Sequence, residues 1–438
     1  MAAGMVDSRL LGLQGSFWSV ADQGVVSLGT FLTSIMLARS LSPGDYGAYS
    51  ALLAGLLFLN GIHAALVTSP LSVEGAATDP ATLRRYSTGA VLFTIVLAAP
   101  SGLLLAAPAG FVRSSLWIWA PVWLVLWQLQ ETMRRSLMCG LGHRRAIWGD
   151  TVSYLGQAVL IWAGWRTGSL TLERAFAIIA LTSGVAAVLQ ATQAGLAHVE
   201  LGELRRLARG FWKFGSWMLY GCFASMFTSQ AFFWVLALSK GPRETASLQA
   251  VANVLGVCHP LMFGLGNLLV PVVARAKAIG GFTLAWRSAR EQGVRFGLVL
   301  LAFFGILLLW PHTVLSMLYG PASPYAGLVG PLRLFVASYA FLYVVQVLGL
   351  FLTGNGKAKE VFQIQLSGAL SSVLLGLPLA YIWGTAGACA GMLAVNATKC
   401  IAGAAQAFRL GSNRVEIHNR ETPLDRALSP TAIEPKDC

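Results

Sequence analysis

Apolar segments of about twenty residues, long enough to cross the roughly 30 Å hydrocarbon core of a bilayer as helices, recur along the whole sequence. They constrain the fold more strongly than any other feature. Only 11% of the 438 residues are charged, whereas charged residues make up about 25% of a typical soluble domain. We therefore predict an all-α polytopic membrane protein with about twelve transmembrane helices, at residues 12–37, 48–70, 86–108, 115–138, 147–165, 172–196, 211–238, 246–271, 292–311, 328–353, 361–383 and 386–408.

The positive charges are distributed unevenly between the two sides of the predicted spans. The formal net charge is +13, and most of the 31 Lys and Arg residues fall in connections on one side, such as 133–145, 203–213 and 275–295. Cytoplasmic loops of membrane proteins carry such an excess of positive charge. We therefore expect both termini in the cytoplasm and no nucleic-acid partner. The polar segment 409–438 is expected to be a disordered cytoplasmic tail.

Two stretches about 200 residues apart resemble each other, "GSFW" from Gly15 and "GSWM" from Gly215. The offset equals six predicted spans, and because six is even, both copies cross the membrane in the same direction. We predict two pseudo-twofold-related six-helix lobes around a central cavity, an N-terminal lobe at 1–205 and a C-terminal lobe at 206–408. Lobes of this kind rock about a site between them in alternating access.

Asp22 lies close to the middle of the first predicted span, where an ionisable side chain is costly and is a functional candidate by default. A carboxyl in this position could carry a proton or an ion through a transport cycle. Alternatively, a hydrogen-bonded Asp22 could fix the first span to a neighbouring helix. The sequence leaves both interpretations open.

Other polar side chains at membrane depth are candidates for lining the cavity, with interhelical hydrogen bonds as their alternative role. Asn60 and His63 share one face of the second span, and the repeat maps Asn60 onto His259 in the eighth. For Lys213 and Arg333, at span ends, snorkelling to the interface is the simpler explanation. The full candidate set is Asp22, Gln23, Arg39, Asn60, His63, Lys213, Gln230, Asn253, His259, Asn267, Arg333 and Lys399. The six cysteines show no metal-ligand spacing, so no metal site is expected.

The first predicted hairpin carries the stretch "LARSLSPGDYGAYS" from Leu37 to Ser50. This stretch resembles the N-terminal signature of the polysaccharide-transporter family, in the multidrug/oligosaccharidyl-lipid/polysaccharide (MOP) exporter superfamily. The resemblance implies a MATE-like fold and a non-enzymatic flippase of the bacterial inner membrane. Its substrate would be an undecaprenyl-pyrophosphate-linked oligosaccharide, such as an O-antigen or exopolysaccharide unit, whose pyrophosphate Arg39 could contact at the outer mouth. Its partners would be the lipid bilayer, this glycan, and polysaccharide polymerase or glycosyltransferases.

Two other classes of protein fit parts of the sequence. A cation-coupled multidrug exporter of the same superfamily would use Asp22 for coupling to protons or sodium ions, and no further cofactor is expected. A membrane glycosyltransferase would need catalytic residues outside the membrane, but the longest predicted outer loop, 312–327, contains no acidic residue and no arginine. The second and eighth spans contain no arginine, in contrast to the related lipid II flippases, which argues against lipid II as the substrate.

Overall fold

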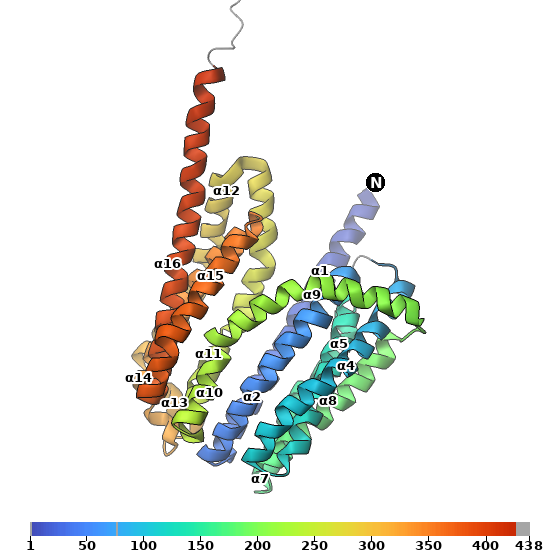
Figure 1. The fold of residues 1–438 in the computed structure, drawn as a ribbon, viewed down its shortest axis with the longest axis vertical. Coiled ribbons are helices and arrows are strands. Elements are labelled where there is room, and N and C mark those ends of the chain that lie inside the picture. Colours follow the sequence, from blue (N-terminus) through green and yellow to red (C-terminus); the bar gives the residue numbers. More distant parts are fainter. Residues whose placement is uncertain (1, 76–77, 426–438) are drawn as a thin grey trace, which may run out of the picture.

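The computed structural model describes residues 2–75 and 78–425, and in these ranges the chain forms helices and no strand (Figure 1). Side chains are described for residue 18 and for 21–410, except at 76–77, 112 and 267. The helices are α1 (Ala2–Ser40), α2 (Pro43–His63), η1 (Ala64–Thr68), α3 (Ser69–Gly75), α4 (Pro80–Val112), α5 (Leu116–Cys139), α6 (His143–Asp150), η2 (Thr151–Leu155), α7 (Gly156–Arg166), α8 (Leu172–Ala194), α9 (Leu201–Thr228), α10 (Gln230–Ser239), α11 (Pro242–Gly256), α12 (His259–Leu309), α13 (Pro311–Tyr319), η3 (Pro324–Gly327), α14 (Val329–Gly354), α15 (Ala358–Ser371), η4 (Ser372–Gly376) and α16 (Leu377–Asp425).

Glycine-containing turns fold the two longest helices back on themselves. α12 reverses at Gly280 and Gly281, where Gly281 has a φ of 67°, and α16 reverses at Gly384, where φ is 62°. Glycine adopts such angles readily because it has no Cβ. Figure 1 shows the hairpin that results in α12. Each of these helices therefore contains residues of two predicted spans.

Seven helices in the described part of the chain are long and apolar enough to cross a membrane, or eight if the bent pair of α9 and α10 counts as one span. The predicted number of twelve is larger, in part because α12 and α16 count here as one helix each, although both are broken at glycines and each contains residues of two predicted spans. Other predicted spans are interrupted: 147–165, for example, is divided among α6, the π-helical turn η2 and α7. The predicted all-helical class is confirmed.

The helices form two groups that meet along α2, α10 and α11 (Figure 1). In the first group, α5 packs against α4 and α8, and α1 packs against α6, η2 and α7. In the second group, α14 packs against α12 and α16, and α15 packs against α16 and α9. Because α2 packs against α10 and α11, the space in the middle of the molecule is enclosed by helices from both groups.

The hairpin between α1 and α2 joins the two groups at one end of the molecule. The guanidinium of Arg39 donates hydrogen bonds of 2.6 and 2.7 Å to the carbonyls of Leu318 and Met317 in the last turn of α13. The hydroxyl of the buried Tyr46 accepts a hydrogen bond of 2.7 Å from Nδ2 of Asn253. Gly47 lies so close to the carbonyl of Pro242 that a side chain at position 47 would overlap it. Residues of the "LARSLSPGDYGAYS" stretch thus close the molecule at this end.

The predicted disordered tail differs from the structure in its first part. α16 continues to Asp425, so residues 409–425 are helical, and residues 426–438 lie outside the described part of the chain. The sequence holds no proline between the last predicted span and Pro423, and a helix extends readily once it has been nucleated. The end of the apolar span therefore did not mark the end of the helix.

Candidate functional site

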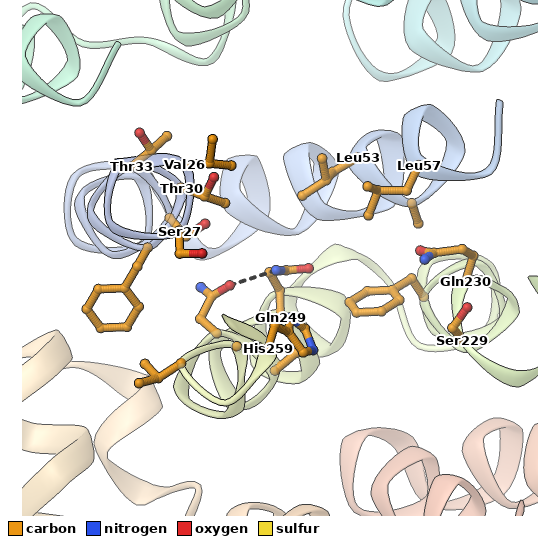
Figure 2. Close-up of a pocket in the computed structure, with 18 of the residues that line it drawn as sticks. Val26, Ser27, Thr30, Thr33, Leu53, Leu57, Ser229, Gln230, Gln249 and His259 are labelled. Atoms are coloured by element: carbon orange, nitrogen blue, oxygen red, sulfur yellow. Dashed lines mark hydrogen bonds between the residues drawn. The ribbon is translucent and has the colours of Figure 1, made fainter. Parts of the chain in front are cut away.

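A cavity of about 1000 Å³ lies between the two groups of helices. Its walls come from α1, α2, α5, η2, α7 and α8 in the first group and from α9 to α12 and α14 to α16 in the second. Side chains of α1 and α2 face side chains of α10, α11 and α12 across it (Figure 2). The volume is at the upper end of the range of about 300–1000 Å³ that is usual for small-molecule sites.

The described lining residues are mostly neutral polar or aromatic. Amide groups come from both groups of helices, among them Gln23, Gln157, Gln249, Asn253, Gln365 and Asn396. Ser27 and Thr30 contribute hydroxyls from α1, and Trp123 and Trp127 contribute indole rings from α5. Such a lining offers both hydrogen-bond donors and acceptors to a ligand, together with flat apolar surfaces.

Lys399 on α16 is the only fully charged side chain among the described residues that line the cavity. The residue is only 5% exposed, and it forms no ion pair with a described carboxylate. Gly368 on α15 makes room for the aliphatic part of this side chain, because a Cβ at position 368 would overlap Cε of Lys399. The cavity wall therefore carries one positive charge that no acid among the described residues neutralises.

Five of the predicted site residues line the cavity: Gln23, Gln230, Asn253, His259 and Lys399. Gln249 donates a hydrogen bond of 2.8 Å to Oδ1 of Asn253, drawn as a dashed line in Figure 2. The imidazole of His259 is hydrogen-bonded to the Tyr339 hydroxyl at 3.1 Å. Sequence analysis therefore selected at least one cavity residue on each of α1, α10, α11, α12 and α16.

Asp22 lies behind the cavity wall, in a buried cluster of charged side chains. Its carboxylate accepts a hydrogen bond of 2.8 Å from Nη2 of Arg134, and Nε of Arg134 donates one of 2.5 Å to Asp150. Glu131 contributes a third carboxylate, 3.4 Å from Arg134. The cluster connects α1, α5 and α6. This geometry corresponds to the second interpretation of Asp22, in which its side chain fixes the first span to neighbouring helices.

His63 has the alternative role, interhelical hydrogen bonding, and neither His63 nor Asn60 is among the described residues that line the cavity. His63 is buried, and its Nε2 is hydrogen-bonded to the hydroxyls of Thr94 at 3.0 Å and Thr132 at 3.2 Å. Its face of α2 therefore packs against α4 and α5 within the first group of helices. Asn60 is not among the described residues that line the cavity, although the repeat maps it onto His259.

Three of the remaining candidates, Arg39, Lys213 and Arg333, lie away from the cavity. Arg39 contacts α13 as described above, and Lys213 is exposed on α9. Arg333 is also exposed, and its Nε donates a hydrogen bond of 3.3 Å to the carbonyl of Leu308. The side chain of Asn267 lies outside the described residues.

Sequence analysis missed Arg134 and most of the hydroxyl groups in the cavity. Arg134 was assigned only to the basic segment 133–145, although its spacing of three residues from Glu131 is typical of an ion pair on a helix. Ser27, Thr30 and Ser34 line the cavity from one face of α1. Their spacing of three and four residues, which places them on one face of a helix, was the available signal.

Comparison with solved structures finds the same fold at low sequence identity. A multidrug resistance MATE family transporter of the MOP superfamily, in an inward-facing conformation, has a TM-score of 0.70 and 14% identity over 90% of this chain and 96% of that chain. An outward-facing conformation of such a transporter gives a TM-score of 0.61 and 15% identity over 93% and 96% of the two chains.

A third similar structure is a MOP superfamily transporter from Pyrococcus furiosus Vc1, with a TM-score of 0.63 and 14% identity over 92% of this chain and 95% of that chain. For that protein, the reverse polarity of the binding pocket is said to suggest a different function. No known protein family and no curated protein matches the sequence. The chain therefore has the fold of MATE transporters of the MOP superfamily, as the sequence predicts.

Proposed function

We propose that the protein is a flippase that exports an anionic, lipid-linked oligosaccharide across the membrane by alternating access. The observation that carries this proposal is the large cavity, whose described lining combines amides, hydroxyls and indole rings with one lysine and no carboxylate. Sugar hydroxyls can exchange hydrogen bonds with the amides and hydroxyls. A phosphate group can accept charge-assisted hydrogen bonds from the ammonium group of Lys399.

The sequence resemblance adds the identity of the carrier, undecaprenyl pyrophosphate, with an O-antigen or exopolysaccharide repeat unit as the cargo. In this conformation Lys399 is better placed than Arg39 to contact the pyrophosphate, because the guanidinium of Arg39 is occupied by the carbonyls of α13. The protein would act in the bacterial inner membrane with both termini in the cytoplasm. Polysaccharide polymerase or glycosyltransferases would be its functional partners.

The contacts of Arg39, Tyr46 and Gly47 support alternating access, because they join the two groups of helices at the predicted outer end. With that end closed, the head group of the substrate would enter the cavity from the cytoplasmic side. The two groups would then rock about the cavity, and the outer contacts would break to release the head group outside.

A cation-coupled multidrug exporter is the second candidate, and the likeness to multidrug MATE transporters favours it. Two features of the site favour the flippase instead. Lys399 would repel a cationic drug from the cavity. Asp22, the acid on which the exporter hypothesis rests, is bonded to Arg134 behind the cavity wall.

The test uses a strain that lacks the protein. Intact spheroplasts are treated with periodate, used as a membrane-impermeant oxidant of glycans, and the undecaprenyl-linked glycans are then extracted. We expect unoxidised repeat units to accumulate in this strain, and the wild-type protein to clear them. Lys399→Gln should clear them poorly. The control Lys359→Gln, which changes an exposed lysine at the start of α15, should clear them like the wild type.

The two candidates predict opposite results. If every lipid-linked glycan has the same distribution with and without the protein, the flippase is rejected. Loss of ethidium efflux in the same strain, restored by the wild-type protein and not by Asp22→Asn, would then support the multidrug exporter. Accumulation of repeat units with normal ethidium efflux would reject the exporter.

A further inference from the structure

A second, smaller cavity of about 440 Å³ lies between α2 with η1 on one side and α9 with the start of α10 on the other. We call it the side groove, and it is lined by residues within 57–69 and 218–230. Four residues line both cavities: Leu57, Ser225, Ser229 and Gln230. The side groove therefore adjoins the central cavity. Away from that junction its walls are mostly apolar, with Phe58, Met218 and Met226 among them.

Close contacts between helices bound the side groove at both ends. At one end the indole Nε1 of Trp234 on α10 donates a hydrogen bond of 3.2 Å to the carbonyl of Ala51 on α2. At the other, Gly215 packs against Ala65, where an added Cβ would lie 2.5 Å from the carbonyl oxygen. At the helical rise of 1.5 Å per residue, the stretch 57–69 gives the groove a length of about 18 Å.

Within the groove α2 and α9 also approach each other, because a Cβ at position 61 would lie 2.8 Å from Sγ of Cys222 and the ring of Phe58 packs against that of Phe223. The side groove is thus a short recess between these helices and does not run the full length of the bundle.

The side groove lies next to the outer surface of α9. Three large side chains in the turns of α9 that line the side groove are exposed: Trp217 (76%), Tyr220 (63%) and Phe223 (46%). On a membrane-spanning helix, large exposed apolar side chains face lipid, because they would be unfavourable in water. The side groove therefore lies between the lipid-facing surface of α9 and the polar central cavity.

A break in the helix marks the boundary between the apolar groove and the polar cavity. α9 and α10 meet at an angle of 44°, and Ser229 between them has φ of −136° and ψ of −67°. Figure 2 shows Gln230 beside Ser229 at this boundary, near Leu57. The carboxamide of Gln230 makes no hydrogen bond to another described residue, so it is available to a ligand that passes from one space to the other.

We propose that the side groove holds the polyprenyl chain of the substrate while the head group occupies the central cavity, with the carboxamide of Gln230 contacting the linkage between them. The proposal rests on the proposed function and adds the path of the carrier chain. Burial in an apolar groove stabilises a hydrocarbon chain, whereas the amides and the lysine of the cavity suit a glycan and a phosphate. One molecule with both parts needs two adjoining spaces, one with several amides and a lysine and one without a charged side chain among its described lining residues. A small drug would need only the central cavity.

The test is photolabelling of the purified, full-length protein in lipid nanodiscs. The probe is geranylgeranyl diphosphate with a diazirine on its prenyl chain. We expect labelled peptides within residues 57–69 and 218–230, and protection by unlabelled geranylgeranyl diphosphate. Gly221→Phe should lower labelling by about tenfold or more, because position 221 lines only the side groove and has open space around an added Cβ. Gly305→Phe is the matched control, since Gly305 also has open space and lines neither cavity.

Two results would overturn the proposal. Labelling that Gly221→Phe leaves unchanged would place the chain elsewhere. Equal labelling of the groove by a diazirine-bearing phosphatidylglycerol would make it a general site for membrane lipid. Labelling by the prenyl probe alone, lost in Gly221→Phe and retained in Gly305→Phe, supports the proposal.

The strain assay separates this proposal from the proposed function. If Lys399→Gln fails to clear repeat units and Gly221→Phe clears them normally, the side groove is not used and the flippase stands. If both variants fail and Gly305→Phe succeeds, both proposals are supported. If the strain without the protein accumulates no repeat units, the flippase is rejected. The proposal that the side groove binds the substrate is then rejected too, even if the prenyl probe labels the groove.

Discussion

Replacing Lys399 by methionine should raise the stability of the protein and lower its affinity for an anionic ligand. The ammonium group is almost buried and unpaired among the described residues, and removing an uncompensated buried charge is favourable. Because this charge borders the cavity, we expect the free energy of unfolding to rise by about 1–2 kcal/mol, less than the several kcal/mol expected for a fully buried ion. A hydrogen bond to a charged ligand contributes about 1.5–3 kcal/mol, so affinity for an anionic ligand should fall about 10- to 150-fold.

The assay measures both quantities on the same purified protein. Binding of geranylgeranyl diphosphate is titrated by thermophoresis, and stability is followed by thermal unfolding in the absence of ligand. Lys399→Arg should retain most of the binding, because a guanidinium also donates charge-assisted hydrogen bonds to phosphate. Lys359→Met, at an exposed position on α15, should change neither quantity.

A purely structural role for Lys399 would give the opposite pattern. If Lys399→Met lowers the unfolding temperature while binding per folded molecule stays at the wild-type value, the ammonium stabilises the fold and does not bind the ligand. The reasoning from the unpaired charge would then be refuted.

Three further substitutions test the buried cluster and the closed end of the molecule. Arg134→Gln should destabilise the protein by about 3–5 kcal/mol, because it leaves the buried carboxylates of the cluster without their cation; thermal unfolding measures this, and an unchanged unfolding temperature would contradict it. Arg39→Gln should speed amide hydrogen exchange in residues 317–325, because it removes the hydrogen bonds to α13; wild-type exchange there would exclude Arg39 as a closing contact. Gly47→Ala should favour the state open at this end, because its Cβ overlaps a facing carbonyl. The control Gly44→Ala, with only an ordinary contact at 3.8 Å, should not favour that state. Equal accessibility of a cysteine introduced at position 249 in both variants would refute this prediction.

The helical class could be predicted from the sequence because hydropathy is a local property, whereas the MATE-like fold was implied by the resemblance of residues 37–50 to a family signature. An apolar stretch of about twenty residues is stable in lipid whatever its neighbours are. The order of spans then restricts the arrangement to few alternatives. The breaks inside α12 and α16, at glycines with positive φ, separate the same apolar stretches that the hydropathy pattern separates.

The faces that the helices turn toward the cavity could not be derived in the same way. His63 and Asn253 are both polar residues within spans, yet His63 bonds to Thr94 inside one group of helices, whereas Asn253 lines the cavity. Asn253 bonds to Tyr46, which is 207 residues away in the sequence. Contacts over such distances set the rotation of each helix, and no local pattern records them. The spacing of Arg134 from Glu131 was a local signal for their ion pair, but the bonds of Arg134 to Asp22 and Asp150 are contacts between helices of the same long-range kind.

The ion pair between Asp22 and Arg134 also bears on how the protein is made. The two residues are 112 positions apart, so a growing chain contains the acid of α1 well before its partner in α5 exists. The span in α1 has a mean hydropathy of 1.2, against 2.2 for the span in α4, and an unpaired carboxylate makes insertion less favourable still. We expect α1 to enter the bilayer stably only after α5 has been synthesised. Nascent chains arrested before residue 116 should then leave α1 extractable from the membrane by alkaline carbonate, and chains extended beyond residue 150 should retain it.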